Sequence, residues 1–291
     1  MNNIIIKDHQ IKSDLPKGLT YVDQSLIIAR NQIFQEPIKI TIEDDNNESL
    51  YIVVEENANI KIILEIASRD LTKNNYKLNL VAHQNAQVKY LLVTELSSKD
   101  ALVEHYFTVE RDAKLDLIGG FVSDILNAKM HVDLVGPGAE VKLRAIAVSS
   151  DNNQQNIDVL IIHKAPDTIG NMTNIGIANK HGKIILNGVE KIEKGMKRAN
   201  AFQTLKGIIT SDTATVEVNP ILLINEYDVK AGHGATIGKL EEDQLYYLQS
   251  RGLTKAEAEK LIVNGFLTPI IEEIEDEPLK ERFISLVNSR I

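Results

Sequence analysis

The sequence of 291 residues has no cysteine and no tryptophan, and aromatic residues make up only 5% of it. Without cysteine the chain can form no disulfide, and it can offer no thiolate to a metal. Isoleucine, valine and leucine dominate its apolar residues instead. Because these branched side chains pack well on a pleated surface, the composition favours tightly stacked β-structure.

A concentrated positive field is also missing, since the formal net charge is −9 and the isoelectric point is about 5.4. This balance argues against nucleic acid and against an anionic membrane surface as the main partner. The first apolar run, residues 4–6, ends at Lys7 and is too short for a signal peptide. No apolar run of 18 residues follows it. We therefore expect a cytoplasmic protein.

Four segments repeat one pattern, in which a strand-like apolar run, a short polar turn and a small residue precede a second apolar run. An alanine closes each turn, and the successive spacings are 28, 27 and 26 residues. These alanines are Ala58, Ala86, Ala113 and Ala139. Both a meander of antiparallel hairpins and a solenoid of stacked coils fit such units. The near-constant spacing favours the solenoid, in which each coil buries its apolar face against its neighbours.

Helix signals appear only in the last fifty residues. The pattern predicts a β-rich body over 1–240, with 1–37 as a short lead-in, and a helical subdomain over 241–291. The boundary signals are Gly252 after Arg251, the capping box from Thr254 to Glu257, a stop at Asn264 and Gly265, and Pro278 in the first turn of a third helix.

Two segments carry a family resemblance. Residues 198–220 read RANAFQTLKGIITSDTATVEVNP, and residues 219–266 contain a predicted Gly-His-Gly turn at Gly232, His233 and Gly234. The chain resembles the SufB/SufD family of iron–sulfur cluster assembly scaffolds. The resemblance implies a right-handed parallel β-helix. SufB-type members carry glutamate at the position of Gly234, so the chain is similar to the SufD type. Ala231 departs from that type, which usually has cysteine there.

The resemblance also implies a function. It implies a non-catalytic scaffold that pairs with a SufB-type subunit along edge strands near residues 200–238, or with a second copy of itself in isolation. His233 would be a metal ligand at that interface. The C-terminal helices would dock a SufC-type ABC ATPase, and the candidate docking residues are Leu245, Tyr246, Leu248 and Arg251. No cofactor would be bound stably. A transient iron–sulfur cluster at the interface would take its thiolates from another chain.

Other chemistry finds little support in the sequence. The six remaining histidines are dispersed and form no HExxH pair, although His83, His105 and His131 fall near equivalent points of the repeat. Those three could stack as a ladder or be ordinary surface histidines. The stretch from Gly234 to Leu240 lacks both the spacing and the hydroxyl of a P-loop. Two alternatives remain open: an adaptor subunit without a metal role, and a carbohydrate-active β-helix.

Overall fold

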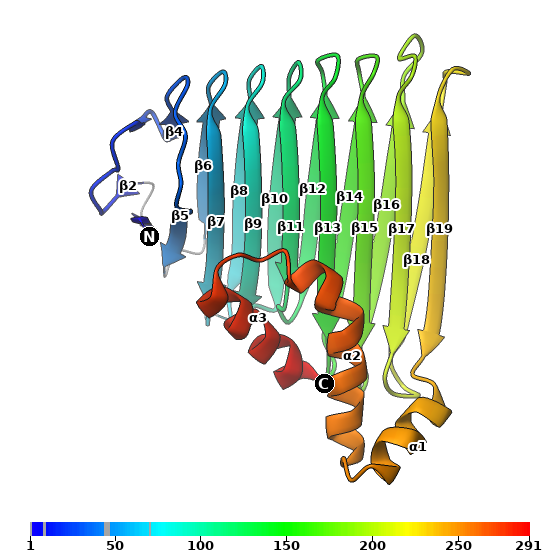
Figure 1. The fold of residues 1–291 in the computed structure, drawn as a ribbon. Helices are drawn as coiled ribbons and strands as arrows, with labels where there is room; N and C mark the ends of the chain where they lie inside the picture. The colour runs from blue at the N-terminus through cyan, green and yellow to red at the C-terminus, as the bar shows by residue number, and fades with distance from the viewer. Residues whose placement is uncertain (1, 8–9, 44–46, 70) are drawn as a thin grey trace.

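The protein is a parallel β-solenoid of about seven turns with three C-terminal helices, as seen in a computed structural model (Figure 1). The structure describes residues 2–7, 10–43, 47–69 and 71–291. Successive strands of the body alternate between two sheets that lie face to face. No helix among the described residues is both long enough and apolar enough to cross a membrane.

One sheet has ten strands. In spatial order they are β19 (Lys230–Lys239), β17 (Asn200–Ile209), β15 (Ile169–Ala178), β13 (Glu140–Ser149), β11 (Lys114–Phe121), β9 (Gln87–Leu96), β7 (Asn59–Ser68), β5 (Ile38–Glu43), β1 (Asn2–Lys7) and β2 (Gln10–Ile11).

The other sheet has nine strands. They are β18 (Thr215–Ile224), β16 (Lys183–Ile192), β14 (Gln154–His163), β12 (Leu126–Leu134), β10 (Asp100–Val109), β8 (Lys73–Ala82), β6 (Asn47–Val54), β4 (Ser25–Ile28) and β3 (Leu19–Val22).

Strand pairing confirms the solenoid and rules out the meander of hairpins. Among the described residues, only β1 with β2 and β3 with β4 pair antiparallel. The parallel register repeats the period read from the sequence: Asn59 pairs with Gln87, Gln87 with Lys114, and Lys114 with Glu140. These steps equal the spacings of the turn alanines, because each alanine closes the turn that starts a strand.

The turns explain why the period is kept. The four turn alanines are fully buried. The residue before each has a positive φ, as at Asn57 (57°), Asn85 (60°) and Gly138 (74°). Asparagine, aspartate and glycine tolerate this left-handed conformation better than other residues do. The Asn85 side chain donates to Asn57 at 3.1 Å, and Asn57 donates to Asn31 at 2.9 Å. This ladder fastens one turn to the next.

The core has two parts. Inward-facing Ile, Leu and Val side chains of both sheets fill the interior of the solenoid. A second core lies on the outer face of the ten-stranded sheet, where apolar residues of β7 to β17 pack against the helices. These helices are α1 (Glu242–Ser250), α2 (Lys255–Ile271) and α3 (Glu277–Arg290). Helices α2 and α3 lie across the sheet, and α1 extends beyond its end (Figure 1).

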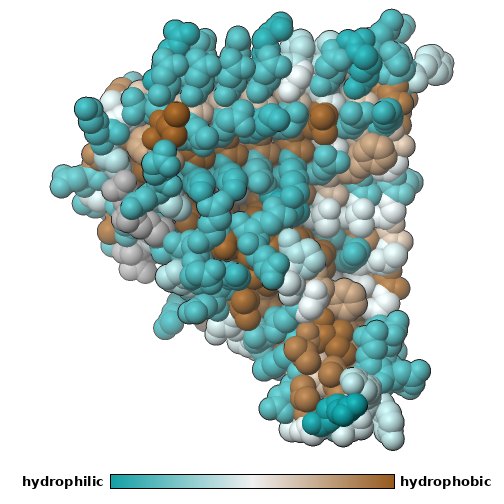
Figure 2. Space-filling model, viewed as in Figure 1, coloured by the Kyte–Doolittle hydropathy of each residue, from teal (hydrophilic) through white to brown (hydrophobic). Residues whose placement is uncertain are grey.

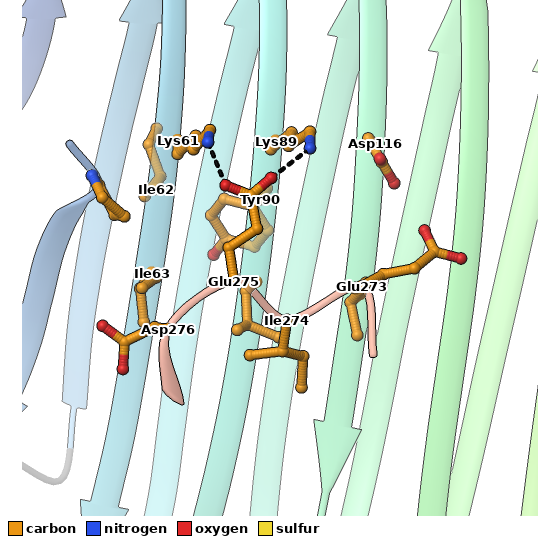
Figure 3. Close-up of a pocket in the computed structure, with 13 residues that line it drawn as sticks. Lys61, Ile62, Ile63, Lys89, Tyr90, Asp116, Glu273, Ile274, Glu275 and Asp276 are labelled. Atoms are coloured by element: carbon orange, nitrogen blue, oxygen red, sulfur yellow. Dashed lines mark hydrogen bonds and ion pairs between the residues drawn. The ribbon is translucent and has the colours of Figure 1, made fainter. Parts of the chain in front are cut away.

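Ion pairs fix the segment between α2 and α3 to the sheet. Glu275 reaches Lys89 at 2.6 Å and also contacts Lys61, so one carboxylate bridges two neighbouring strands (Figure 3). Glu273 contacts Lys142 at 2.9 Å and the buried Arg144.

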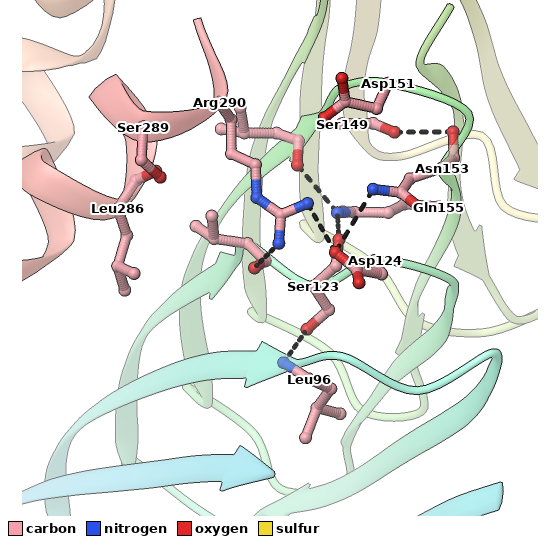
Figure 4. Close-up of polar contacts among 12 residues, drawn as sticks. Leu96, Ser123, Asp124, Ser149, Asp151, Asn153, Gln155, Leu286, Ser289 and Arg290 are labelled. Atoms are coloured by element: carbon pink, nitrogen blue, oxygen red, sulfur yellow. Dashed lines mark hydrogen bonds and ion pairs between the residues drawn. The ribbon is translucent and has the colours of Figure 1, made fainter. Parts of the chain in front are cut away.

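Two arginines of helix α3 form three further ion pairs with the body. Arg282 pairs with Glu65 at 2.8 Å and with Glu95 at 2.9 Å. Arg290 pairs with Asp124 at 2.7 Å (Figure 4). The position of α2 and α3 on the body is therefore set by charge as well as by apolar contact.

Two sequence-based expectations about local structure are wrong. Gly232 to Gly234 form no turn, because they lie inside β19 and pair in register with β17. Asn264 and Gly265 do not end the second helix, since buried residues such as Leu267 and Ile270 keep α2 on the sheet up to Ile271. Two possibilities were open for the histidines of the repeat. The ladder does not occur, as His105 pairs with Met130 rather than with His131. His105 is not an ordinary surface histidine either, because it is 1% exposed.

The other helix signals are confirmed. The Thr254 side chain and Glu257 form the predicted capping box at the start of α2. Gly252 follows the C-cap residue Arg251 with φ of 99°. Asp276 caps α3, and Pro278 lies in its first turn.

Candidate functional site: the open end of the solenoid and helix α1

The C-terminal end of the solenoid has two unpaired strand edges. Strands β18 and β19 are the last of their sheets, and within the described chain each pairs on one side only. An exposed edge presents a row of backbone donors and acceptors to any extended partner. Apolar side chains are exposed beside it, with 42% of Ile221, 47% of Leu223 and 50% of Ile237 accessible. This end is therefore built for further β-pairing.

His233 lies on this edge, in β19, beside Gln203 of β17. Its side chain is exposed, and it forms no hydrogen bond or ion pair with any residue that the structure describes. The two flanking glycines have no side chain that would cover the backbone. Phe202 lies against Gly232, and nothing lies within 4 Å of the place where a side chain of Gly234 would begin. A ligand or another backbone can therefore approach the His233 ring closely.

His233 belongs to no metal-binding cluster in the described part of the chain. No group of three or more His, Cys, Asp or Glu side chains that could hold a metal ion occurs there. Of the two acidic residues close in sequence, Glu226 is engaged elsewhere. Its carboxylate accepts hydrogen bonds from the backbone N–H groups of Gly195 and Tyr227, each at 2.9 Å. A metal at His233 would need its other ligands from a second molecule.

Sequence reasoning missed a group of buried polar side chains in the interior of the last coils. Glu190 of β16 is fully buried, and neither of its oxygens has a hydrogen-bond partner in the described structure. Burial raises the pKa of this carboxyl to about 8. His163 of β14 keeps one ring nitrogen on Thr168 at 2.7 Å, and burial lowers its pKa to about 4. Gln203 donates to the Ile221 carbonyl at 2.8 Å.

One sequence signal could have found Glu190. Strand β16 alternates strictly between buried and half-buried residues, and Glu190 takes a buried position among Ile184, Leu186 and Ile192. An acidic residue at an inward position of such a strand is unusual, because burial of an unpaired carboxyl is costly. Buried polar residues also occur in earlier coils, as at Asn74 and His105.

Helix α1 and its C-cap residue Arg251 carry the four predicted docking residues, and the structure keeps α1 largely free of the body. None of its residues is fully buried. Leu245 is half-buried against the second core, whereas 76% of Tyr246 is exposed. The Arg251 guanidinium lies 5.2 Å from the centre of the Tyr247 ring. The four residues therefore do not act as one face: Leu245 attaches α1 to the body, and Tyr246 points to solvent.

A groove between α1 and α2 adds to this surface. Leu248 and Tyr247 of α1 line it together with Leu261 and Ile262 of α2. Leu261 is 52% exposed. The space-filling view shows apolar surface gathered over α2 in this region (Figure 2). Six residues of β19 separate His233 from Lys239, which is about 20 Å at ~3.3 Å per residue. The edge with His233 and the helical surface are therefore two distinct surfaces.

Comparison with known proteins agrees with this geometry. Residues 40–266 match the family described as SUF system FeS cluster assembly, SufBD core domain. The chain is 30% identical to the iron–sulfur cluster assembly protein SufD of Bacillus subtilis over 304 aligned positions, which cover all of this chain and 69% of that protein.

Two further relatives match at lower identity. An iron–sulfur cluster assembly SufBD family protein of Mycobacterium tuberculosis is 26% identical, over 83% of this chain and 30% of that protein. The chloroplast protein ABCI7 of Arabidopsis thaliana is 25% identical, over 81% of this chain and 51% of that protein. The chain thus spans about a third and about a half of these two longer relatives. The parallel β-solenoid, its open C-terminal edge and the matched core domain together show that this chain belongs to the SufBD family of the SUF iron–sulfur cluster assembly system.

Proposed function

We propose that the chain is a SufD-type scaffold subunit, non-catalytic by itself, that pairs through β18 and β19 with a SufB-type subunit. The observation that carries the proposal is the pair of unpaired edges at the C-terminal end, with apolar side chains exposed beside them. A partner with the same architecture could continue both sheets. Its backbone would then satisfy donors and acceptors that face only water in the isolated chain.

The C-terminal helices form the second proposed contact, with a SufC-type ABC ATPase. The groove between α1 and α2 and the exposed Tyr246 support this assignment, because aromatic and aliphatic side chains at such a site favour a protein partner. Leu245 has a different role, since it packs against the body. Of the four docking candidates, we assign the contact itself to Tyr246, Leu248 and Arg251.

His233 would provide an imidazole ligand for iron at the edge interface. Imidazole suits iron, and the flanking glycines leave the ring accessible. With no cysteine in the chain, every thiolate of a cluster built there would come from the partner. The iron–sulfur cluster would be cargo that is assembled and passed on rather than a resident cofactor.

The pairing is tested by copurification with the SufB-type subunit. The double variant Ile221→Lys with Leu223→Lys places two charges beside the edge, and we expect it to lose the partner. The double variant Val22→Lys with Ile33→Lys is the matched control. Its side chains are 55% and 64% exposed, and they lie at the other end of the solenoid. Equal partner recovery with both double variants would contradict pairing through β18 and β19.

A second candidate function is an adaptor that keeps both contacts without a metal role. The absence of Cys from the chain and the lack of a cluster of three metal ligands in the described structure favour it. Anaerobic cluster reconstitution on the assembled complex separates the two. The scaffold with a metal role predicts a lower cluster yield for His233→Ala than for the wild type. Equal cluster yields from His233→Ala and the wild type would favour the adaptor function.

A further inference from the structure

The turn that joins β18 to β19 presents one aromatic side chain entirely to solvent. Tyr227 lies in this turn, residues 225–229, and its exposed fraction is 102% of the reference value. It is the most exposed large apolar side chain in the described structure, ahead of Tyr246 at 76%. An aromatic ring in this position adds nothing to the stability of the isolated chain.

The turn that carries Tyr227 is held by side-chain contacts. The Glu226 carboxylate accepts the backbone N–H of Tyr227 at 2.9 Å and that of Asp228 at 3.3 Å. Its other oxygen accepts the N–H of Gly195, which belongs to the preceding turn, at 2.9 Å. These backbone hydrogen bonds hold the pKa of Glu226 below its ordinary value, so the carboxylate is charged at neutral pH.

The preceding turn is fastened in the same way. The Arg198 backbone N–H donates to the Asp228 carbonyl at 2.6 Å. The Arg198 guanidinium makes two hydrogen bonds to Asp167, at 2.5 and 2.6 Å. Three successive turns are therefore linked in a row, and Tyr227 stands at the end of the row. A side chain on an ordered turn loses less entropy on binding than one on a free loop.

The surroundings of Tyr227 indicate the chemistry of its partner. The adjoining turn holds the exposed Lys194 and Lys197, and β19 begins with the exposed Lys230. Of the acidic side chains nearby, Glu226 is bonded to backbone N–H groups and Glu193 to Lys191, which leaves Asp228 against these three lysines. Tyrosine is enriched in the few side chains that supply most of the affinity of an interface, and such residues insert into closely fitting pockets. The lysines would favour acidic groups at the rim of that pocket.

We propose that Tyr227 is the anchor residue of the edge interface and inserts into an apolar pocket with an acidic rim on the SufB-type subunit. This inference rests on the proposed pairing through β18 and β19, because the turn joins those two strands. It adds a specific side chain and the chemistry of its pocket, neither of which the backbone edges define. Glu226 is a positioning residue, because it acts only through the turn.

Titration calorimetry of the full chain with the SufB-type subunit tests the inference. We expect Tyr227→Ala to bind at least about 30-fold more weakly, the effect of losing a central interface residue. Tyr227→Phe keeps the ring, so its affinity should stay within about 3-fold of the wild type. Glu226→Ala keeps Tyr227 but loosens the turn, and it should fall between the two. Tyr51→Ala in β6, a tyrosine that is 45% exposed and has no assigned contact, is the matched control and should bind the SufB-type subunit as the wild type does.

The outcomes separate this inference from the proposed pairing. If wild type and Tyr227→Ala bind equally well, the anchor role is wrong and the pairing stands. If the wild type shows no binding, the pairing fails and the anchor role fails with it. A thermal midpoint of Tyr227→Ala equal to that of the wild type confirms that the loss is local. A lowered midpoint with loss of ATPase binding as well would overturn the anchor role in favour of general damage.

Discussion

Glu190 has the strongest conflict between a residue and its surroundings in the described structure. Its carboxyl group is fully buried without a hydrogen-bond partner, and burial raises its pKa from 4.5 to about 8. The ionised form is therefore strongly disfavoured inside the solenoid, whereas the unfolded chain ionises near pH 4.5. Between these two values the folded state binds more protons than the unfolded state does, so stability falls as the pH rises through this window.

We predict that Glu190→Gln stabilises the protein at pH 8 and has little effect at pH 4.5. The free energy of unfolding of the wild type should fall by roughly 4 kcal/mol between pH 5 and pH 8 through this residue alone. Urea unfolding at several pH values measures the slope. Glu193→Gln, a half-exposed carboxylate paired with Lys191, is the matched control and should keep the wild-type slope. A Glu190→Gln protein with that same slope would contradict the assignment.

For His105 we predict the opposite pH dependence, in which stability falls as the pH falls. It is buried between Tyr90 and Phe107, with ring centres at 5.9 and 6.0 Å, and burial lowers its pKa from 6.5 to about 3. Its depressed folded pKa means that only the unfolded chain gains a proton as the pH falls from 6.5 towards 3. Stability through His105 should drop by about 2 kcal/mol between pH 6.5 and pH 5.

Replacing His105 with Phe should remove this acid-induced loss. The measurement is the urea midpoint between pH 5 and pH 7. His181→Phe changes an exposed histidine and should leave the pH dependence as it is in the wild type. If His105→Phe loses stability in acid as steeply as the wild type, the buried ring does not titrate as its surroundings imply.

Among the secondary-structure elements, α3 depends most clearly on one small residue beneath it. Phe283 of α3 is 1% exposed and lies over Gly120 of β11. A Cβ atom on Gly120 would come within 2.4 Å of the Phe283 ring, which is far closer than atoms can pack. The ring is held by the second core, so relief requires movement of α3 itself.

We predict that Gly120→Ala costs about 1–3 kcal/mol, as overpacking of a filled core does, and loosens α3. Limited proteolysis should cut α3 faster than in the wild type. Gly238→Ala is the matched control, because nothing lies within 4 Å of the place where its Cβ would be. Cleavage of α3 at the wild-type rate in Gly120→Ala would show that the helix can adapt without moving.

The elements also show what the sequence could and could not predict. The solenoid was predictable because each turn repeats a small buried residue and a polar residue in a left-handed conformation, and both are local requirements. The ends of α2 and the strand at His233 depend on distant contacts. Leu267 extends α2 because the sheet lies beneath it, and Gly232 stays extended because β17 pairs with it. Burial and pairing across 30 or more residues outweigh the local preference of glycine.

The candidate site was predictable only as separate residues. The position of His233 on an open edge follows from the order of strands in the sheet, which no local pattern states. The exposure of Tyr227 could not be predicted for the same reason, because it depends on β18 and β19 being the last coil. Glu190 was visible as an acidic residue within an apolar alternation, but its lack of a partner is a property of the packed interior.

At the scale of the whole molecule, the contacts that stabilise the coils are unevenly distributed along the solenoid axis. Helices α2 and α3 cover the outer face of the ten-stranded sheet over the middle coils, and ion pairs join them to β7, β9 and β13. Two hairpins, β1 with β2 and β3 with β4, close the N-terminal end. In the described structure no further strand pairs with the last coil, and the small apolar cluster beside it has three buried residues. Stability in a repeat architecture is a sum of terms from neighbouring coils, so an end coil with one neighbour opens first.

We predict that hydrogen exchange is fastest in β18 and β19 and slowest in β9, β11 and β13. Native-state exchange followed by mass spectrometry of peptides gives this order directly. Addition of the SufB-type subunit should slow exchange in β18 and β19 and leave the middle strands unchanged, because the partner would supply the missing neighbour coil. The Ile221→Lys with Leu223→Lys variant should show no such slowing. Equal protection along the whole solenoid, or first opening at the N-terminal hairpins, would mean that the open end is stable by itself and has no need of a partner strand.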